Sequence, residues 1–227
     1  MDGVYTDNVK KGFDFFSVLG DEEKVLIQKS SNLVRYNKRD TIFLQNTRTS
    51  HLMYVKSGLV KIYKEGRMGK TVILKLASEG AFVGLMSTFG SEIHEYSGAA
   101  VVPTEIMFID INAFKSLIKS NGEFAFNLIK ILSQNGLYIF NKLIAQTHKQ
   151  LPGRIADVLL YFSEVIYLKE RFELPLTRKE LAELAGTTKE SFIRTLTEFK
   201  NDKIIEVFDN EIEIKSMKIV KTLSELG

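Results

Sequence analysis

A segment near the C-terminus decides the fold: residues 176–201 read LTRKELAELAGTTKESFIRTLTEFKN. Apolar residues recur at helical spacing on both sides of Ala185-Gly186-Thr187, which interrupts them as a tight turn. Small Ala182, four residues before Gly186, lets two helices cross closely, and the glycine supplies the backbone freedom of the turn. The spacing therefore predicts a helix-turn-helix.

The second helix of this motif has one apolar face, which we expect to pack against the first helix. The predicted core between the two helices consists of Leu181, Leu184, Phe192 and Leu196, and Phe199 shares the apolar face of the second helix. Thr187 or Thr188 caps the second helix with its hydroxyl. The positive end of the helix dipole then remains available to a DNA phosphate.

The opposite face of the second helix carries side chains suited to reading bases. At 3.6 residues per turn it is made up of Glu190, Arg194, Thr197 and Asn201. Arg194 can donate two hydrogen bonds to guanine, Glu190 can accept one from cytosine N4, and Lys189 can reach guanine O6 or N7. The alternative is an ordinary exposed ion pair between Glu190 and Arg194, worth only about 0.3 kcal/mol.

Short strand patterns follow the motif. Residues 203–207 and 211–214 alternate around Asp209-Asn210, which predicts a two-stranded wing and makes the module a winged helix. A basic cluster that could anchor the DNA backbone consists of Arg178, Lys179 and Lys189.

The N-terminal half has the sequence pattern of a β domain. Short runs rich in β-branched and aromatic residues occupy residues 41–44, 52–55, 59–63, 71–76, 99–102 and 105–109. Ser57-Gly58, Glu65-Gly66 and Glu79-Gly80 separate several of these runs and suit hairpin turns. Strands at this spacing predict a small barrel or jelly roll.

Helical spacing replaces the strand pattern after Ile111. A short helix is predicted to end near Asn121-Gly122, and a long one to run from Glu123 to about Lys149. The apolar stripe of the long helix is broad enough to need two partners. We expect one to be the β domain and the other to be the same helix of a second subunit, along a seam of Leu132, Gly136, Ile139 and Leu143. A monomer that buries this helix internally is the alternative.

Pro152-Gly153 interrupts the helical pattern and predicts a hinge and a domain boundary. The expected fold class is α+β. The predicted segments are an N-terminal β jelly-roll sensor domain (1–122), a dimerisation helix with the hinge (123–151) and a C-terminal winged helix-turn-helix domain (152–227).

Composition narrows the function classes. The chain has 227 residues, a net charge of +3 and no cysteine. Nucleic-acid contact must therefore be local, and disulfides, thiolate catalysis, cysteine-ligated iron-sulfur clusters and the usual structural zinc sites are excluded. Residues 1–10 lack an apolar signal-peptide core, and no run reaches the length of a membrane span, so we expect a cytoplasmic protein with no membrane partner.

Taken together, the β domain, long helix, hinge and winged helix resemble the CRP/FNR family of bacterial regulators. The resemblance also rests on Gly153-Arg154-Ile155-Ala156, on the stretch from Gly186 to Arg194, and on a Gly-Ala-Phe-Val-Gly run that ends at Gly84, where alanine replaces the family's usual aspartate. It implies a transcription regulator that is not an enzyme, binds a palindromic operator in double-stranded DNA as a homodimer, and contacts RNA polymerase if it activates.

The family's DNA contacts can be carried over by position. They place base reading on Lys189, Glu190 and Arg194, and backbone contacts on Arg178, Lys179, Thr188 and Ser191. Lys189 stands where the family commonly has arginine, and an ammonium cannot reproduce bidentate guanidinium geometry.

An effector pocket in the β domain is also implied by the resemblance. Its positions here are Gly84, Leu85, Met86, Tyr96, Ser97, Ile139 and Phe140. Members that bind cyclic AMP hold its ribose with a glutamate and its phosphate with an arginine-serine pair, whereas this chain has Leu85 and Tyr96-Ser97 at those places. Because burying a phosphate without a cation is costly, we expect cyclic AMP not to be the ligand. An iron-sulfur cluster is disfavoured because cysteine is absent, and a small apolar or weakly polar effector, or none, is expected.

Three alternatives remain. Haem is one, since possible axial ligands are His51, His94, His148 and Met86, although these show no paired motif. An enzyme in the β barrel is another, but no paired histidine and carboxylate motif lies on the strands. The third is an interaction protein whose winged helix binds another protein.

Overall fold

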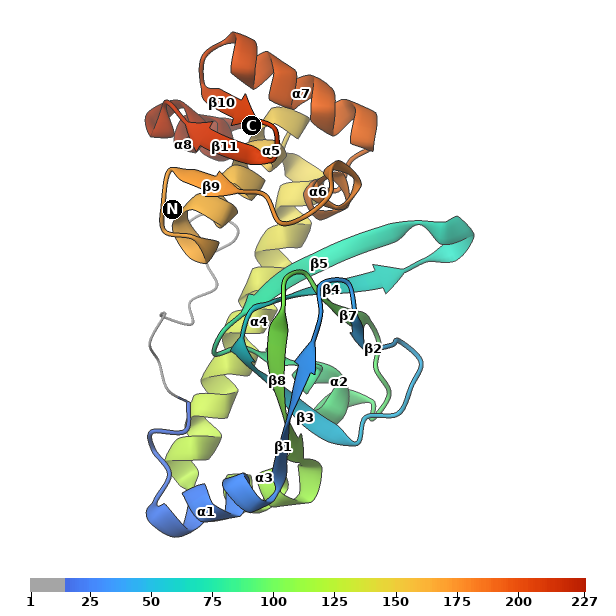
Figure 1. Ribbon diagram of the computed structural model, residues 1–227, viewed down its shortest axis with the longest axis vertical. Coiled ribbons are helices and arrows are strands. Elements are labelled where there is room, and N and C mark those ends of the chain that lie inside the picture. Colours follow the sequence, from blue (N-terminus) through green and yellow to red (C-terminus); the bar gives the residue numbers. More distant parts are fainter. Residues whose placement is uncertain (1–14) are drawn as a thin grey trace. The chain divides into compact units, whose positions relative to one another are not determined.

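The computed structural model describes residues 15–227 (Figure 1). Residues 1–10, which we expect not to form a signal peptide, lie outside the described part. In the described chain, one compact unit ends at Gln134 and the other begins at Asn135, inside a long helix. The three segments expected from the sequence stay a prediction. None of the described helices is both long enough and apolar enough to cross a bilayer.

The N-terminal unit is a β-roll of two four-stranded antiparallel sheets. One has the strand order β1-β8-β3-β6 and the other β2-β7-β4-β5. The strands are β1 (Ser31–Tyr36), β2 (Thr41–Phe43), β3 (His51–Ser57), β4 (Leu59–Glu65), β5 (Thr71–Ser78), β6 (Phe82–Val83), β7 (Ser97–Ala100) and β8 (Thr104–Asp110). The helices are α1 (Asp21–Lys29), the 3-10 turn η1 (Arg67–Gly69), α2 (Leu85–Gly90) and α3 (Ile111–Ser120). With the long helix and the winged helix, this confirms the expected α+β class.

Strand β3 lies at the centre of this unit and is buried on both faces. Leu52 and Tyr54 point into a core built with helices α1 and α3 and the start of the long helix. Met53 and Val55 point the other way, into a core between the two sheets. Because side chains alternate along a strand, two cores appear in the sequence as a continuous apolar run rather than an alternating one.

The predicted strands are confirmed with small shifts, except that residues 99–102 correspond to a strand, β7, that begins at Ser97 and ends at Ala100. The sequence gives no signal for β1. This strand pairs only with β8, and four of its six residues are exposed, so no alternating pattern marks it. The two-residue strand β6 is too short to show any period.

Only one of the three predicted hairpin turns is a hairpin. Glu65-Gly66 joins the paired strands β4 and β5. Ser57-Gly58 joins β3 to β4, and Glu79-Gly80 joins β5 to β6, and in each case the two strands belong to different sheets. Gly58 and Gly80 adopt φ of +94° and +88°, so glycine is needed at both corners. Local turn chemistry predicts the bend but not which strand the chain pairs with next.

The long helix α4 spans Gly122–His148, as predicted, and helix α5 begins at Leu151. The two residues of the predicted hinge, Pro152 and Gly153, lie inside α5 rather than between two helices. Pro152 occupies the first turn of α5, where its missing N–H costs nothing. A Cβ at Gly153 would come within 2.9 Å of the Leu223 carbonyl oxygen, so this glycine serves close packing against the C-terminal helix.

The C-terminal unit is a winged helix on a helical base. Its helices are α5 (Leu151–Leu160), the π-helical turn η2 (Tyr161–Ile166), α6 (Arg178–Ala185), α7 (Lys189–Asn201) and α8 (Met217–Leu226). Its strands are β9 (Arg171–Glu173), β10 (Ile205–Phe208) and β11 (Glu211–Ile214), in the order β10-β11-β9. The predicted two-strand wing is therefore part of a three-stranded sheet.

Replacing Gly58 by alanine should destabilise the protein by about 3 kcal/mol, because it adds left-handed strain to overpacking. The new Cβ would lie 2.6 Å from the Pro103 carbonyl oxygen. Gly69→Ala is the matched control, since Gly69 also has positive φ, +68°, but its Cβ would meet nothing within 4 Å. It should cost only about 1 kcal/mol. Equal losses in urea unfolding would show that the corner is not tightly packed.

Candidate DNA interface

Helix α6 starts at a reciprocal cap. The N–H of Thr177 donates to Glu180 Oε2 (2.8 Å), and the N–H of Glu180 donates to Thr177 Oγ1 (3.3 Å). This capping box satisfies two of the N–H groups that a helix start leaves unpaired. The first helix of the motif therefore begins at a defined residue, Arg178.

The turn between α6 and α7 depends on Gly186. It has φ +67° and ψ 44°, and the N–H of Thr187 returns to the Ala182 carbonyl (2.9 Å). A Cβ on Gly186 would lie 2.9 Å from Gln146 Nε2 of α4. Ala182 is only 1% exposed, which confirms that a small side chain stands at the helix crossing.

Thr188, rather than Thr187, caps the second helix. Its Oγ1 accepts from the N–H of Ser191 (3.2 Å), and its hydroxyl also bonds to Ser191 Oγ (3.1 Å). Both hydroxyls therefore lie at the start of α7, where a helix presents its positive end. The buried face of α7 is confirmed as Phe192, Leu196 and Phe199, each no more than 5% exposed.

The other face of α7 is open. Its exposed residues are Lys189, Glu190, Ile193, Arg194, Thr197, Glu198, Lys200 and Asn201. Within residues 15–227, no ion pair joins Glu190 to Arg194, so the ordinary ion-pair alternative is not what the structure shows. Both charged side chains are free to meet a partner.

Ile193 is a residue of this face that the sequence analysis missed. It is 41% exposed and lies about one helical turn from Lys189, Glu190 and Thr197. An apolar residue in a helix pattern is normally assigned to the core. Here Phe192 and Leu196 already form the core, and Ile193 lies outside it on the exposed side of the helix.

The basic residues at the start of α6 are partly engaged. Arg178 donates to the Asp209 carbonyl in the turn of the wing (2.8 Å) and is half-buried. Lys179 lies 3.8 Å from Glu183 in an exposed pair. Arg178 thus ties the motif to the wing, a contact between distant segments that no local pattern indicates.

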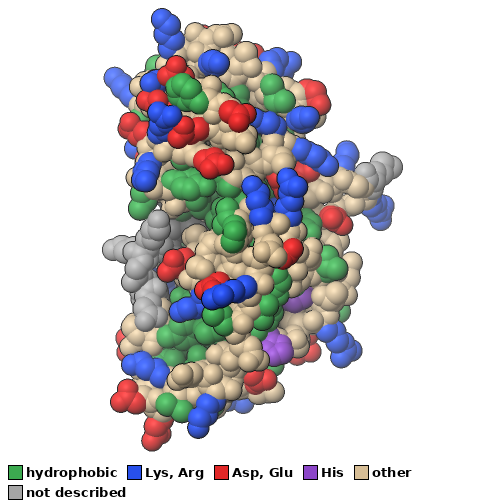
Figure 2. All heavy atoms as spheres, viewed as in Figure 1, with side chains coloured by type: hydrophobic (Ala, Val, Ile, Leu, Met, Phe, Trp, Pro, Cys, Tyr) green, Lys and Arg blue, Asp and Glu red, His purple; other side chains and the backbone are tan. Residues whose placement is uncertain are grey.

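The wing itself is rich in acidic side chains that neighbouring cations neutralise. Glu211 pairs with Arg171 (2.6 Å), whose guanidinium also lies 5.0 Å from the centre of the Phe208 ring. Lys215 pairs with both Glu206 and Glu213 (3.0 and 2.7 Å). Figure 2 shows basic and acidic side chains interspersed over this unit. Within the described wing sheet, the cations of Arg171 and Lys215 are therefore already paired with carboxylates.

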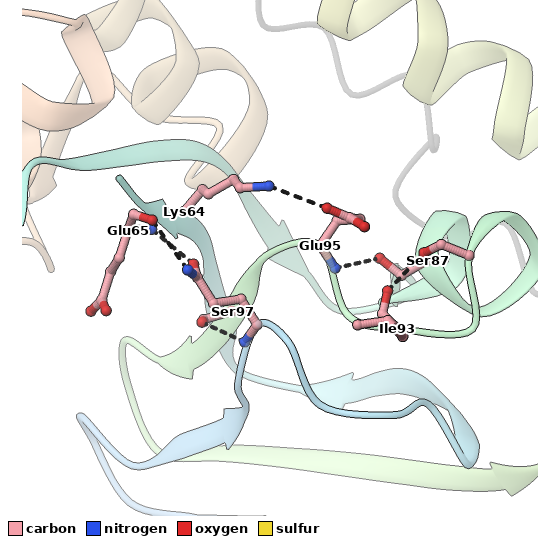
Figure 3. A network of polar contacts seen from close by, with 8 residues as sticks. Lys64, Glu65, Ser87, Ile93, Glu95 and Ser97 are labelled. Carbon is pink, nitrogen blue, oxygen red and sulfur yellow. Dashed lines mark hydrogen bonds and ion pairs between the residues drawn. The ribbon is translucent and has the colours of Figure 1, made fainter. Parts of the chain in front are cut away.

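In the β-roll, a network of polar contacts links side chains of β4, α2, the loop after α2 and β7 (Figure 3). Ser87 Oγ accepts from the N–H of Glu95 (3.1 Å), and Glu95 pairs with Lys64 (3.3 Å). Ser97 Oγ accepts from the N–H of Gln45 (2.9 Å). The ammonium of Lys64 is thus paired within the protein, whereas the Ser97 hydroxyl accepts one hydrogen bond and keeps its O–H donor.

The predicted pocket residues have unlike environments. Leu85 is 2% exposed within the core of the β-roll, whereas Met86 is 41% exposed. Tyr96 is half-buried, and burial raises the pKa of its phenol while hydrogen bonding to Ser87 opposes the shift. Ile139 and Phe140 are 49% and 65% exposed on α4, in the other unit.

His94 is the candidate haem ligand that stands out. Its side chain is buried, burial lowers the pKa of its imidazole, and its Nδ1 has no hydrogen-bond partner in the described chain. The ring packs against Phe43, with centres 4.5 Å apart. By contrast, His51 Nδ1 lies 2.9 Å from Ser50 Oγ and His148 is exposed at the end of α4.

The proposed dimer seam differs from the exposed stripe of α4. Leu132 packs partly buried against the β-roll core, so it faces inward. The large apolar side chains that α4 exposes are Phe126, Ile129, Leu137, Ile139, Phe140, Leu143 and Ile144. A Cβ on Gly136 would meet nothing within 4 Å. An exposed apolar stripe of this length marks an interaction surface.

Comparisons with known families match both units. Residues 33–121 match the cyclic nucleotide-binding domain, and residues 153–222 match the Crp-like helix-turn-helix domain. The chain is 24% identical over 177 residues to a CRP-like cAMP-activated global transcriptional regulator of Mycobacterium tuberculosis, covering 76% of this chain and 79% of that protein. It is 23% identical over 185 residues to the cAMP-activated global transcriptional regulator CRP of Salmonella typhimurium, covering 79% and 88%.

Solved structures share the fold. FixK2 from Bradyrhizobium japonicum has a TM-score of 0.78 at 18% identity, covering 85% of this chain and 96% of that one. A CRP/FNR-family transcriptional regulator from Thermus thermophilus has a TM-score of 0.69 at 22% identity, covering 86% and 98%.

Proposed function

Because the chain belongs to the CRP/FNR family of bacterial transcription regulators, we propose that it binds a palindromic operator as a homodimer and reads it with α7. The family consists of DNA-binding regulators and not of enzymes. The observation that carries the proposal is the capped helix α7, whose exposed face holds a carboxylate and a guanidinium that are not paired with each other in the described chain.

Base recognition is assigned to three side chains. Arg194 would donate two hydrogen bonds to guanine O6 and N7, and Glu190 would accept from cytosine N4. Lys189, at the start of the helix, would reach a guanine with a single donor. All three are exposed, so reaching a base requires no rearrangement of the core.

Backbone contacts are assigned to the starts of the two helices. Thr188 and Ser191 place hydroxyls beside the N-terminus of α7, a site that favours phosphate. Arg178 keeps donors beyond the one used on Asp209, because a guanidinium has five N–H groups. The exposed ammonium of Lys179 would add a phosphate contact that salt weakens.

Ile193 adds an apolar reading group to this surface. Among base edges in the major groove, only thymine presents a methyl group, and apolar side chains contact it. An exposed β-branched side chain one turn from Glu190 therefore favours a thymine near the cytosine that Glu190 reads.

The dimer would form along the exposed stripe of α4. Phe126 and Ile129 are three residues apart, and Leu137, Phe140 and Ile144 follow eight residues later at steps of three and four, so all five share one side of the helix that a second helix could pack against. Of the seam expected from the sequence, Ile139 and Leu143 belong to this stripe and Gly136 borders it, whereas Leu132 is partly buried against the core of the β-roll. Gly136 supports the seam, since no contact in the described chain needs its small size but a second helix could approach closely there.

Cyclic AMP is not the effector that we propose, although the M. tuberculosis and S. typhimurium relatives are cAMP-activated. A buried cyclic phosphate needs a cation, but the cation of the polar network, Lys64, is paired with Glu95. The carboxylate of Glu95 would also repel a phosphate. A small apolar or weakly polar molecule fits Met86 and Tyr96 better. If the bound protein activates transcription, RNA polymerase is its partner.

Arg194→Ala and Glu190→Ala should each weaken binding to the selected operator by about 5- to 150-fold and relax the preference at one base pair per half-site. Fluorescence anisotropy with the operator and its single-base variants measures both effects. Lys218→Ala, an exposed cation on α8, is the control and should leave the base preference unchanged. Unaltered specificity in both α7 variants would contradict the reading surface.

Replacing the thymine that Ile193 contacts by uracil removes only the C5 methyl. Wild-type affinity should fall about 4-fold per methyl, from about 0.8 kcal/mol of buried apolar surface each. Ile193→Ser should bind the thymine and uracil operators equally. A wild-type protein that does not distinguish the two operators at any position would rule out this role.

Leu137→Glu should convert the protein to a monomer, because a carboxylate buried in an apolar seam costs about 3 kcal/mol or more. Light scattering should report the mass of two 25.8 kDa chains for the wild type and one for the variant. Asn112→Glu is the control, at an exposed polar position on α3 outside the stripe, and should leave the mass at two chains. A wild-type mass of one chain would restore the monomer alternative.

A further inference from the structure

Three polar side chains are buried together where α4 meets the DNA-binding module. Lys149 Nζ donates to both carboxylate oxygens of Asp157 (2.7 and 2.9 Å), and the Ser224 hydroxyl donates to Asp157 Oδ1 (2.5 Å). Lys149 Nζ lies 3.4 Å from Ser224 Oγ. The side chain of Asp157 is 1% exposed and that of Lys149 is 17% exposed.

The three residues come from three different parts of the C-terminal unit. Lys149 directly follows the last residue of α4, Asp157 lies in α5, and Ser224 lies in α8. Only Lys149 and Gln150 connect α4 to α5. The cluster therefore connects the residue that follows α4 to both α5 and α8 across this two-residue junction.

A second contact at the same junction leads to the DNA-reading turn. Arg154 of α5 donates to the Gln146 carbonyl in the last turns of α4 (3.3 Å). The side chain of Gln146 in turn lies where a Cβ on Gly186 would meet it. The end of α4, the base of the module and the turn before α7 are thus in continuous contact.

Stability is a poor explanation for such a cluster. Burial raises the pKa of Asp157, and the hydrogen bonds and charge of Lys149 and Ser224 oppose that shift. Replacing a buried ion pair by apolar residues is often neutral or stabilising, because desolvation offsets the attraction. A buried, hydrogen-bonded pair can instead select one geometry among several, as buried polar groups do in some other folds.

We propose that the cluster Lys149, Asp157 and Ser224 is a latch that holds the end of α4 and the winged helix at one fixed angle. The junction then acts as a rigid corner, and a movement of α4 is passed to α7 without bending at Pro152-Gly153. The three members are positioning residues for the recognition helix. The inference rests on the proposed dimer, in which this angle sets the separation of the two α7 helices.

The packing at Pro152-Gly153 agrees with a corner rather than a hinge. Pro152 has a fixed φ in the first turn of α5. The Cα of Gly153 lies so close to α8 that an added Cβ would be 2.8 Å from the Cα of Gly227. Rotation at this point would have to displace α8 as well as break the latch.

Spin labelling tests the latch directly. The chain has no cysteine, so Lys200→Cys on α7 gives one label per subunit and one distance across the dimer. With the parent Lys200→Cys protein, pulsed electron resonance should show a single narrow distance distribution. Adding Lys149→Met with Asp157→Leu should at least double its width, while the thermal unfolding midpoint stays close to that of the parent. The same variant should lose the preference for one spacing between operator half-sites.

Three further variants distinguish loss of the fixed angle between α4 and the winged helix from general destabilisation of the protein. Lys221→Met removes an exposed ion pair of α8 with Glu164 (2.8 Å) and should leave the distribution narrow. Lys149→Arg keeps the charge and should also stay narrow. Ser224→Ala removes one hydroxyl and should partly broaden the distance distribution. It takes the place of the double variant in the test if the double variant does not fold.

An unchanged narrow distribution in the folded double variant, or in Ser224→Ala if the double variant is unfolded, would overturn the latch while leaving the dimer intact. A parent protein that shows no distance between labels would contradict the dimer, and the latch with it.

Discussion

The left-handed backbone of Gly186 is the constraint on which the DNA-reading half depends. It ends α6, turns the chain within three residues and places the Thr188 cap where α7 must begin. The two helices can cross closely because the buried Ala182 is small, and the side chain of Gln146 on α4 lies against Gly186. A side chain at this position would pay left-handed strain of about 1–2 kcal/mol and would also push on α4. One residue thus couples the direction of the recognition helix to the end of the long helix.

Features fixed by nearby residues could be predicted from the sequence. The helix-turn-helix, its capping threonine, the buried face of α7 and the extent of α4 all follow from spacings of three or four residues. The open choice between Thr187 and Thr188 was resolved only by the geometry of the turn. For the sheets, the same local reasoning located the bends at Gly58 and Gly80 but wrongly made them hairpins, because sheet membership depends on strands far away in the chain.

Long-range contacts explain the remaining differences in the site. Nothing around Arg178 indicates that its guanidinium binds the Asp209 carbonyl, 31 residues later. Leu132 fits a dimer heptad by spacing, yet the β-roll core takes it instead. Ile193 has the residue type of a core position and lies on the open face. In each case the deciding partner comes from another element.

The two units differ in how much of their polar chemistry is left free. On α7 the exposed charged groups are free to bind, whereas in the β-roll network Lys64 and Ser97 already have partners within the protein. The central claim is that α7 reads sequence from a two-fold dimer. Selection of bound fragments from random DNA tests it most directly. The account predicts an inverted repeat whose half-site centres lie about 10 base pairs apart, with a guanine-cytosine pair in each half. Recovery of fragments with no shared sequence, or with a single unrepeated site, would contradict it.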